Sequence, residues 1–481
     1  MHRRHPGAGP DGTVARVRRT AALVATGMLV GLLPGQSHAG TTAPFGSDGI
    51  GDPYYPLDGN GGIDVRRYEI HDAYDFADRR ISGWTRLTVH ATETLGGFQL
   101  DFLLPVREVR VDGRRVDWSR PNPHEVRVAV PIRSGSTYDV VVRYAGRPAA
   151  KGWDGEHNWL ADDTEVVAMN EPHIATWWFP ANDHPRDKAR MDIHVTVPRD
   201  MDVIANGQRV SRTVHGDRAT TSWRAAEPMA PYLAFFAAGH FAVRQGRDHG
   251  LPWLVAVSRG IPRPERVRLL RLMERTPAIV HWLQGQLGRY PFSTTGGLTT
   301  RLSPGFALEN QTRPTYDMDL SSSSTVVHEL SHQWFGDSVA VESWRDIWLN
   351  EGAATFMEAR YAETHGGLPA QSWLLDTYQD YADDSWFWDL DIADPGPDQL
   401  FEWPVYERGG MALQALRHRI GSDAFWRLLR QWLRDNSGGN GSTEAFVALA
   451  EQVSGEDLDG FFQAWLRDAA RPARTAANGL A

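Results

Sequence analysis

The hydrophobic pattern of this chain changes from a strand period to a helix period near residue 245. Between residues 68 and 243, apolar and polar residues alternate in short runs such as 84–90 and 124–130, with turn pairs such as Asn206-Gly207 between them. This period of two predicts strands, whereas the pattern after residue 260 is helical. The sequence therefore predicts a multidomain α+β protein. An N-terminal antiparallel β-sandwich or saddle domain at residues 40–245 precedes a mainly helical domain at residues 246–467.

Glycine, proline and capping residues divide the second half into predicted helices. These helices are expected at residues 264–288, 323–334, 351–364, 408–419, 423–434, 443–453 and 458–466. Residues 264–288 are expected to form one or two helices with a kink at Pro277, because proline cannot donate the helical hydrogen bond. Residues 468–481 show no apolar periodicity and are expected to form a disordered tail.

The first 39 residues have the pattern of a secretory leader. Five arginines precede an apolar run at residues 21–33, and the small residues Ser37 and Ala39 follow it. This order predicts a signal peptide that is cleaved after Ala39, and hence a secreted protein. The apolar run is too short to span about 30 Å of hydrocarbon, so we expect no integral membrane association.

The composition excludes several kinds of site. The chain of 481 residues contains no cysteine, which rules out disulfides, cysteine-ligated zinc, iron–sulfur clusters and thiol nucleophiles. Its 60 acidic residues outnumber its 50 basic residues, and the formal net charge is −10. A protein that binds nucleic acid through its overall charge would have the opposite sign, so no nucleic-acid partner is expected.

One motif indicates metal chemistry. Residues 328–332 read HELSH, an H-E-x-x-H pattern on a predicted helix. At 3.6 residues per turn, His328 and His332 project from one helix face, where both imidazoles can reach one metal ion. Glu329 lies about 100° around the helix from His328, close enough to hydrogen-bond a metal-bound water. Since the chain has 18 histidines, the pattern also arises by chance and needs support from its surroundings.

A third ligand is required, because hydrolytic zinc sites use three protein ligands and leave the fourth position to water. Without cysteine, this ligand must be histidine, aspartate or glutamate. Glu351 opens the next predicted helix, and a return helix would place its carboxylate opposite the two imidazoles. The alternative interpretation is that Glu351 is simply a glutamate favoured by the helix dipole.

Further motifs surround these residues. Residues 328–336 read HELSHQWFG, Asn350-Glu351-Gly352 follows, and residues 306–310 read FALEN. Together these motifs resemble the gluzincin zinc metallopeptidases related to aminopeptidase N, with FALEN similar to the family's GAMEN exopeptidase motif. The resemblance covers about residues 49–466 and implies a thermolysin-like catalytic domain with one zinc ion per chain. The large helical C-terminal domain of many relatives is not expected, which predicts a more open site.

The resemblance implies a binding site for the substrate's N-terminus. Glu309 matches the family glutamate that holds the free α-amine, and Ala307 and Asn310 belong to the same motif. Glu171 is the candidate for the second amine contact, and Met169 stands where the family usually has a glutamine. The implied substrates are peptides with a free N-terminus.

The predicted catalytic residues are Glu329 and Tyr406. Zinc can lower the pKa of bound water to about 7, and Glu329 would take the proton and pass it to the leaving amine. Tyr406 matches the family tyrosine that stabilises the transition state, where its hydroxyl would donate to the oxyanion. Thr355 and Glu358 follow Glu351 on the same helix face and are candidates to orient a zinc-bound imidazole.

The sequence thus predicts an exported zinc aminopeptidase, and three alternatives stay open. They are an epoxide hydrolase on the same scaffold, a zinc endopeptidase, and a zinc-stabilised binding protein without catalysis. An epoxide hydrolase for lipids needs a long apolar tunnel, which the sequence does not reveal. Zinc binding alone requires none of Glu329, Tyr406 and Glu309, so their joint presence favours catalysis.

Overall fold

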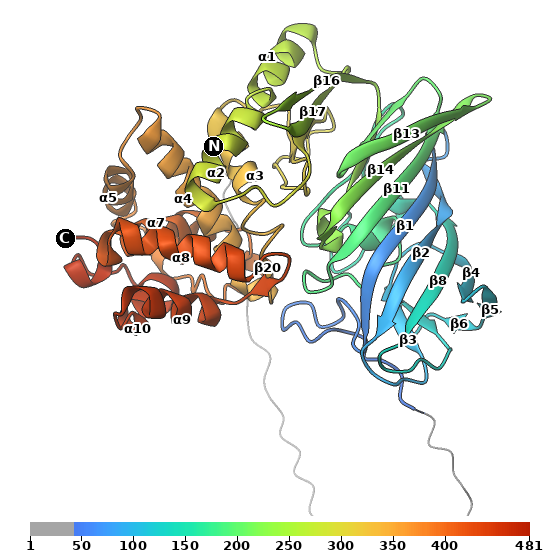
Figure 1. Cartoon of the computed structure of the whole chain (residues 1–481), viewed down its shortest axis with the longest axis horizontal. Coiled ribbons are helices and arrows are strands. Elements are labelled where there is room, and N and C mark those ends of the chain that lie inside the picture. The colour runs from blue at the N-terminus through green and yellow to red at the C-terminus, as the bar shows by residue number, and fades with distance from the viewer. Residues whose placement is uncertain (1–42) are drawn as a thin grey trace, which may run out of the picture. The chain divides into compact units, whose positions relative to one another are not determined.

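The computed structural model describes residues 43–481, with strands in the first part of the chain and helices in the second (Figure 1). The predicted leader at residues 1–39 lies outside these residues. Residues 43–481 make up a single unit by their internal contacts. Within this range, no helix is both long and apolar enough to cross a membrane.

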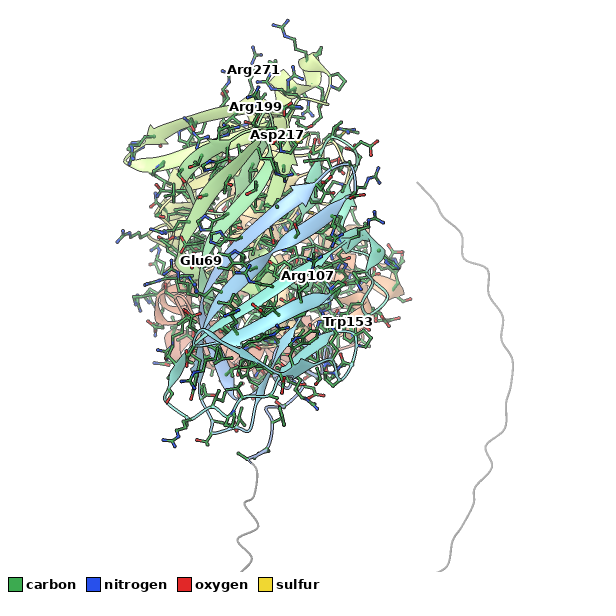
Figure 2. All side chains as sticks on the ribbon, turned by 90° about the vertical axis from the view of Figure 1, so that its right-hand side faces the viewer. Glu69, Arg107, Trp153, Arg199, Asp217 and Arg271 are labelled. Carbon is green, nitrogen blue, oxygen red and sulfur yellow. The ribbon has the colours of Figure 1, made fainter. Side chains whose placement is uncertain are left out.

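The largest sheet has the strand order β13-β14-β11-β1-β2-β8-β4-β5. Its strands are β1 (Ile63–Asp75), β2 (Arg80–Ala91), β4 (Val106–Val111), β5 (Arg114–Val116), β8 (Thr137–Gly146), β11 (Ala189–Pro198), β13 (Gln208–His215) and β14 (Arg218–Met229). Along β1, Tyr68 and Ile70 are buried, whereas Glu69 lies on the outer face of the sheet (Figure 2). The alternation buries one face and leaves the other in water.

This sheet is mixed, which differs from the predicted antiparallel arrangement. β1 and β11 pair in parallel from Arg67↔Arg190 to Ala73↔Thr196. Parallel neighbours need a long connection, and here more than a hundred residues with several other strands separate the two. A period of two is the same in both kinds of pairing, so the hydrophobic pattern could not distinguish them.

Two smaller sheets and the buried face of the large sheet contribute side chains to the same hydrophobic core. One has the order β3-β7-β6, with β3 (Phe98–Asp101), β6 (Trp118–Ser119) and β7 (Glu125–Val128). The other has the order β12-β15-β10-β9, with β9 (Leu160–Ala161), β10 (Val166–Ala168), β12 (Asp202–Ala205) and β15 (Phe236–Gly239). β3, β10 and β15 are buried along their whole length.

The predicted boundary between residues 245 and 246 falls inside a strand. A fourth sheet, of order β16-β17-β18-β19, contains β16 (Phe241–Asp248), β17 (Leu251–Ser258), β18 (Thr295–Thr299) and β19 (Thr315–Tyr316). β16 and β17 form a hairpin that pairs from Phe241↔Ser258 to Asp248↔Leu251. Because a hairpin cannot be divided between two domains, the second region begins near Phe241.

The helical region differs from the prediction in three places. Its helices are α1 (Arg263–Met273), α2 (Thr276–Leu287), α3 (Ser323–Ser331), α4 (Trp348–Thr364), α5 (Ala370–Asp380), α6 (Ser385–Trp388), α7 (Trp403–Ile420), α8 (Ser422–Asp435), α9 (Thr443–Ser454) and α10 (Asp459–Phe462), and β20 (Ala340–Val341) pairs with β21 (Asn440–Gly441). Pro277 lies in the first turn of a separate helix, where its missing N–H costs nothing. The three differences are α5 and α6, which the prediction omitted, and α7, which begins early enough to include Tyr406.

Residues 468–481 pack against the helical region, so the predicted disordered tail is wrong. Thr475 caps a short 3₁₀ helix at Ala476–Asn478. The indole of Trp465 donates to the Asn478 carbonyl at 3.1 Å, and Leu480 is buried. A few separate anchors hold this segment instead of a periodic apolar face, which is why periodicity gave no signal.

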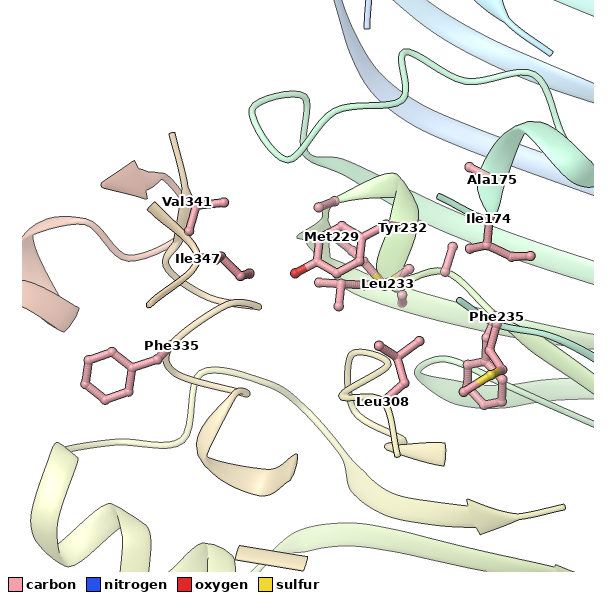
Figure 3. Close-up of a cluster of buried hydrophobic side chains, with 14 of the residues drawn as sticks. Ile174, Ala175, Met229, Tyr232, Leu233, Phe235, Leu308, Phe335, Val341 and Ile347 are labelled. Atoms are coloured by element: carbon pink, nitrogen blue, oxygen red, sulfur yellow. The ribbon is translucent and has the colours of Figure 1, made fainter. Parts of the chain in front are cut away.

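Buried apolar side chains from both halves of the chain meet in one cluster (Figure 3). Met229 and Leu233 come from the β-rich half, and Leu308 and Ile347 come from the helical half. The amide of Asn310 adds a polar link, since it donates to the Leu233 carbonyl at 3.2 Å. These contacts fix the segment that carries Glu309.

Candidate active site

His328, His332 and Glu351 come together between α3 and α4. The Glu351 Oε2 lies 3.2 Å from His328 Nε2 and 3.4 Å from His332 Nε2. Burial alone would raise the pKa of Glu351, but the two histidines lower this pKa to about 2, so the carboxylate is ionised. Two imidazoles and one carboxylate at these separations fit a zinc ion bound at about 2.0–2.2 Å from each donor.

The outer nitrogen of each imidazole has its own hydrogen-bond acceptor. His328 Nδ1 lies 2.8 Å from Glu358 Oε1, and His332 Nδ1 lies 3.0 Å from the Phe335 carbonyl. Ser324 Oγ in turn donates to Glu358. Such acceptors fix the tautomer in which Nε2 keeps its lone pair for a metal. Of the two predicted candidates for this role, Glu358 is therefore the one in position.

Glycines allow α4 and α7 to approach closely. A Cβ on Gly352 would lie 2.8 Å from the Cα of Gly409, and a Cβ on Gly409 would lie 2.9 Å from the Cα of Gly352. This crossing brings Tyr406 to the metal ligands, with its ring centroid 6.0 Å from that of His328. The buried guanidinium of Arg408 anchors α7 because it donates to carbonyls that include Trp465 and Trp388.

A cavity of about 460 Å³ opens beside the three ligands. The residues that line it with them are Asn170, Glu171, Phe306, Ala307, Leu308, Glu309, Thr325, Glu329, Glu358, Phe401 and Tyr406. The cavity therefore combines the loop after β10, the loop before β19, the helices α3, α4 and α7, and the segment just before α7. Carboxylate oxygens of Glu309 and Glu329 and a nitrogen of His332 lie within 4.8 Å of one another.

The cavity has an excess of carboxylates. Burial raises the pKa of Glu171 and of Glu309, and the neighbouring glutamate charges add to the shift. Burial also raises the pKa of Glu329 to about 8, although His328 and His332 oppose this. Burial and mutual repulsion both disfavour the ionised form of these carboxyl groups. A positively charged ligand would offset both, so the site favours such ligands.

Two tyrosine hydroxyl groups lie close to these carboxylates, one behind the cavity lining and one within it. Tyr232 donates to Glu309 Oε1 at 3.4 Å, and the Gln333 amide holds the Glu309 carbonyl at 3.0 Å. Burial, together with the charge of Glu351, raises the pKa of Tyr406 well above its usual value. The Tyr406 hydroxyl therefore keeps its proton and remains a hydrogen-bond donor. Glu171 Oε1, by contrast, is buried and has no hydrogen-bond partner among residues 43–481.

Comparison with known families agrees with this geometry in both halves of the chain. Residues 87–233 match the peptidase M1 N-terminal domain, and residues 296–465 match the peptidase family M1 domain. Together the two matches cover more than half of the chain. The chain belongs to peptidase family M1. The resemblance to aminopeptidase N-type gluzincins is thereby confirmed.

Relatives of this M1 protein include probable aminopeptidase 1 of Sulfurisphaera tokodaii, which is 24% identical over 86% of this chain and 54% of its own length. The M1 zinc metallopeptidase of Deinococcus radiodurans, solved with a Tyr-Ser-Ala substrate, is 26% identical with a TM-score of 0.79 over 88% of this chain and 99% of that one. A two-domain M1 zinc metallopeptidase bound to L-arginine is 27% identical with a TM-score of 0.80 over the same shares. The chain spans about half the length of the curated relatives it matches.

Most of the residues predicted for the site of this M1 protein line the cavity, but two do not. Met169 directly follows β10 and is buried in the core. Asn310 is also fully buried, and its amide binds the backbone of the β-rich half. Neither residue is among those that line the cavity: Met169 is held by packing, and Asn310 is held by a backbone bond.

Sequence reasoning missed several lining residues. Asn170 and Thr325 give polar groups, and Phe306 and Phe401 give apolar ones. The two phenylalanines are 42% and 40% exposed, which is unusual for such large apolar side chains and marks the rim of the cavity. Each residue lies close in sequence to a recognised motif, but no local pattern shows which neighbour turns toward the cavity.

Proposed function

We propose that this M1 protein is a zinc-dependent aminopeptidase that removes the N-terminal residue of peptides. The observation that carries the proposal is the pair Glu171 and Glu309, which line the same cavity as the candidate metal ligands. A protonated α-amine supplies the positive charge that these buried carboxylates lack, and it offers a donor to the unpartnered Glu171 Oε1. The names of the curated relatives and the peptide-bound neighbour support this assignment.

His328, His332 and Glu351 would hold the zinc ion. Zinc bound in such a site acts as a Lewis acid and lowers the pKa of water to about 7. The protein holds the two imidazoles in the required tautomer through Glu358 and the Phe335 carbonyl. The excess negative charge of the cavity favours both a divalent cation and a substrate ammonium group.

The other residues act on protons and on developing charge. Glu329 accepts a proton from the attacking water and transfers it to the departing amine, for which a pKa near neutrality is suited. The protonated Tyr406 hydroxyl donates a hydrogen bond to the oxyanion of the tetrahedral intermediate. Glu309 and Glu171 fix the amine end, so that the first peptide bond lies next to Glu329 and Tyr406.

The test compares leucine 4-nitroanilide with its N-acetylated form, with and without a zinc chelator. We expect cleavage of only the free-amine substrate, abolished by the chelator and restored by zinc. Glu309→Gln is expected to lower kcat/KM about 10- to 100-fold, because it removes a charge-assisted hydrogen bond of about 1.5–3 kcal/mol. The exposed Glu93→Gln on the β-rich half is the matched control and should leave the rate unchanged.

Two outcomes would contradict the proposal in different ways. Equal cleavage of the free and acetylated substrates would show that Glu171 and Glu309 do not select a free α-amine. That result would favour a zinc endopeptidase. Cleavage of neither, by a protein that binds zinc, would favour the epoxide hydrolase or the non-catalytic binding protein, which turnover of a lipid epoxide would separate.

We also propose that the protein is exported after cleavage behind Ala39. The basic segment, the apolar run and the small residues before the cleavage position support this proposal. N-terminal sequencing of protein recovered from the culture medium would show a chain that starts at Gly40. A chain that stays with the cells and keeps its first residues would contradict it.

A further inference from the structure

A second group of histidine and carboxylate side chains lies inside the β-rich half of the protein. Asp101 ends β3 and Glu125 begins β7, and the two residues are directly opposite each other in this antiparallel pair. Like charges at directly opposed positions destabilise a sheet. His124 precedes Glu125, and one ligand atom from each of the three residues lies within 4.8 Å of the others.

The side chains of these three residues are completely buried, with 0% of their surface exposed. Both ring nitrogens of His124 and both carboxylate oxygens of Glu125 lack a hydrogen-bond partner in the part of the chain that the structure describes. Trp153, which is labelled in Figure 2, stacks on the His124 ring at 4.2 Å. Four buried polar atoms without partners are costly unless a guest satisfies them.

The neighbouring cations do not satisfy this group. Arg120 directs its guanidinium to the carbonyls of Phe102, Leu104 and Pro123. His173 contacts other carboxylates, Asp58 and Glu156. Burial raises the pKa of Glu125 and of Asp101. The charge of Asp101 adds to the shift of Glu125, and the charge of Asp58 adds to the shift of Asp101, whereas hydrogen bonds to Asp101, including one that a protonated Glu125 would donate, oppose it. The group therefore favours either a bound cation or a retained proton.

The separations fit a transition-metal ion. His124 Nδ1 lies 3.7 Å from Asp101 Oδ1 and 3.4 Å from Glu125 Oε1. Two donors bound to one tetrahedral zinc ion at about 2.0–2.2 Å are roughly 3.3–3.6 Å apart. An imidazole with two carboxylates suits zinc or manganese, whereas calcium and magnesium prefer oxygen donors alone.

We propose that Asp101, His124 and Glu125 bind a divalent transition-metal ion of the zinc or manganese class, separate from the candidate active site. Its role is structural, because it would neutralise the opposed carboxylates of β3 and β7 and hold the two strands together.

The surroundings of Asp101 support such a site. Its Oδ1 accepts from the Asn60 amide at 3.0 Å, and its Oδ2 accepts from the backbone N–H groups of Gly59 and Asp183 at 3.1 and 2.6 Å. These bonds orient the carboxylate in the way that outer hydrogen bonds orient metal ligands. Asn60 Oδ1 and Asp183 Oδ2, from the same two residues that donate to Asp101, are also buried without hydrogen-bond partners within residues 43–481.

The competing explanation is a proton shared between Asp101 and Glu125 without any metal. The decisive experiment leaves the group intact and removes the candidate active site with His328→Ala and His332→Ala together. This variant is purified from medium supplemented with zinc and manganese, and its metal content is measured by mass spectrometry. We expect about one ion per chain in the variant and about two in the wild type.

A second arm changes the group itself. In the His328→Ala, His332→Ala background, Glu125→Gln is expected to reduce the content from about one ion to about zero, whereas Glu93→Gln on an exposed loop leaves it unchanged. A metal chelator is expected to lower the Tm of the His328→Ala, His332→Ala variant. The same chelator should leave the Tm unchanged once Glu125→Gln is added to that variant. Circular dichroism checks that each variant is folded.

Clear results would overturn the proposal. A folded His328→Ala, His332→Ala variant without metal, both as purified and after refolding with zinc or manganese, would show that no second ion binds. A Glu125→Gln form of this variant with unchanged Tm and unchanged metal content would show that Glu125 does not bind the ion, which would also overturn the proposed site. These readouts are independent of peptidase activity, so the proposal can fail while the proposed function holds.

Discussion

The two clusters of histidine and carboxylate in this protein contain similar donors in very different surroundings. His328, His332 and Glu351 lie between two helices, and each outer imidazole nitrogen has an acceptor. Asp101, His124 and Glu125 lie on two short strands, and His124 has no acceptor for either nitrogen within residues 43–481. The first cluster opens to a cavity of about 460 Å³, whereas the second is closed.

This difference separates a site for chemistry from a site for structure. A reaction needs access for substrate, a nearby base and a donor for developing charge. The proposed base Glu329 and the proposed donor Tyr406 lie only beside the first cluster. A closed cluster can lower the free energy of the fold but cannot admit a peptide. Substitutions at each cluster test this contrast.

Glu329→Gln removes the proposed base without removing a metal ligand. We expect kcat for leucine 4-nitroanilide to fall about 10²- to 10⁴-fold, because general base catalysis typically contributes this much. The metal content should stay as in the wild type, in contrast to the loss expected for Glu125→Gln. Steady-state kinetics and metal analysis on the same samples measure both. A rate within a few-fold of the wild type would remove Glu329 from the mechanism.

Tyr406→Phe keeps the ring beside His328 and removes only the hydroxyl. We expect kcat to fall about 10²- to 10³-fold with little change in KM, since the donor acts on the transition state. Tyr406 is not part of the closed cluster of Asp101, His124 and Glu125. The metal content of that cluster and the Tm of the protein should therefore not change. A rise in KM with unchanged kcat would instead indicate that Tyr406 binds the ground state.

Glu358→Gln weakens the hydrogen bond to His328 Nδ1. We expect zinc affinity at the candidate active site to fall about 10- to 100-fold, the usual cost of losing an outer carboxylate. Competition with a chromogenic zinc chelator measures this affinity, and excess zinc should restore most of the activity. Unchanged affinity would show that the imidazole is oriented without Glu358.

Asp52 can be compared with the carboxylates of both clusters, because it is buried and its oxygens accept several hydrogen bonds. It accepts hydrogen bonds from Ser343, from the Trp344 N–H at 3.0 Å and from His184. Burial would raise the pKa of Asp52, but these partners, His184 first, lower it from 3.8 to about 2. Asp52→Asn is therefore expected to reduce the free energy of unfolding by about 1–3 kcal/mol at pH 7.

The pH dependence of this effect has a definite sign. Because the folded-state pKa of Asp52 is lowered, its contribution is complete above about pH 4 and is lost as the pH falls toward 2. Urea unfolding of the wild type and of Asp52→Asn at several pH values should show the difference shrinking in acid. A difference that grows as the pH falls would contradict the assignment.

Local patterns predicted a large part of this fold. The period of two indicated the long strands of the β-rich half, and most helices begin within a few residues of the expected positions. The parallel pairing of β1 with β11 and the anchoring of residues 468–481 were missed. Both depend on contacts between segments far apart in sequence, and hydrophobic periodicity carries no information on such partners.

In the candidate active site, too, some features could be predicted from the sequence and others depend on the packing of distant segments. The four-residue spacing of His328 and His332 follows from helix geometry, so the sequence alone places both imidazoles on one face. Phe401 and Asn170 reach the cavity only through the packing of distant elements. Met169 and Asn310 were assigned to the cavity by their motifs, whereas the fold buries them elsewhere.

Helix periodicity was enough to predict which residues form the candidate metal-binding helix face, because that geometry repeats with every helical turn. The packing of distant segments, by contrast, brings Glu171 to the cavity with Glu309, and it opposes Asp101 and Glu125 out of reach of water. The physical reason is the range of the interactions. Helical hydrogen bonds and side-chain periodicity act over a few residues, whereas sheet pairing, burial and charge depend on whichever segments the folded core brings together.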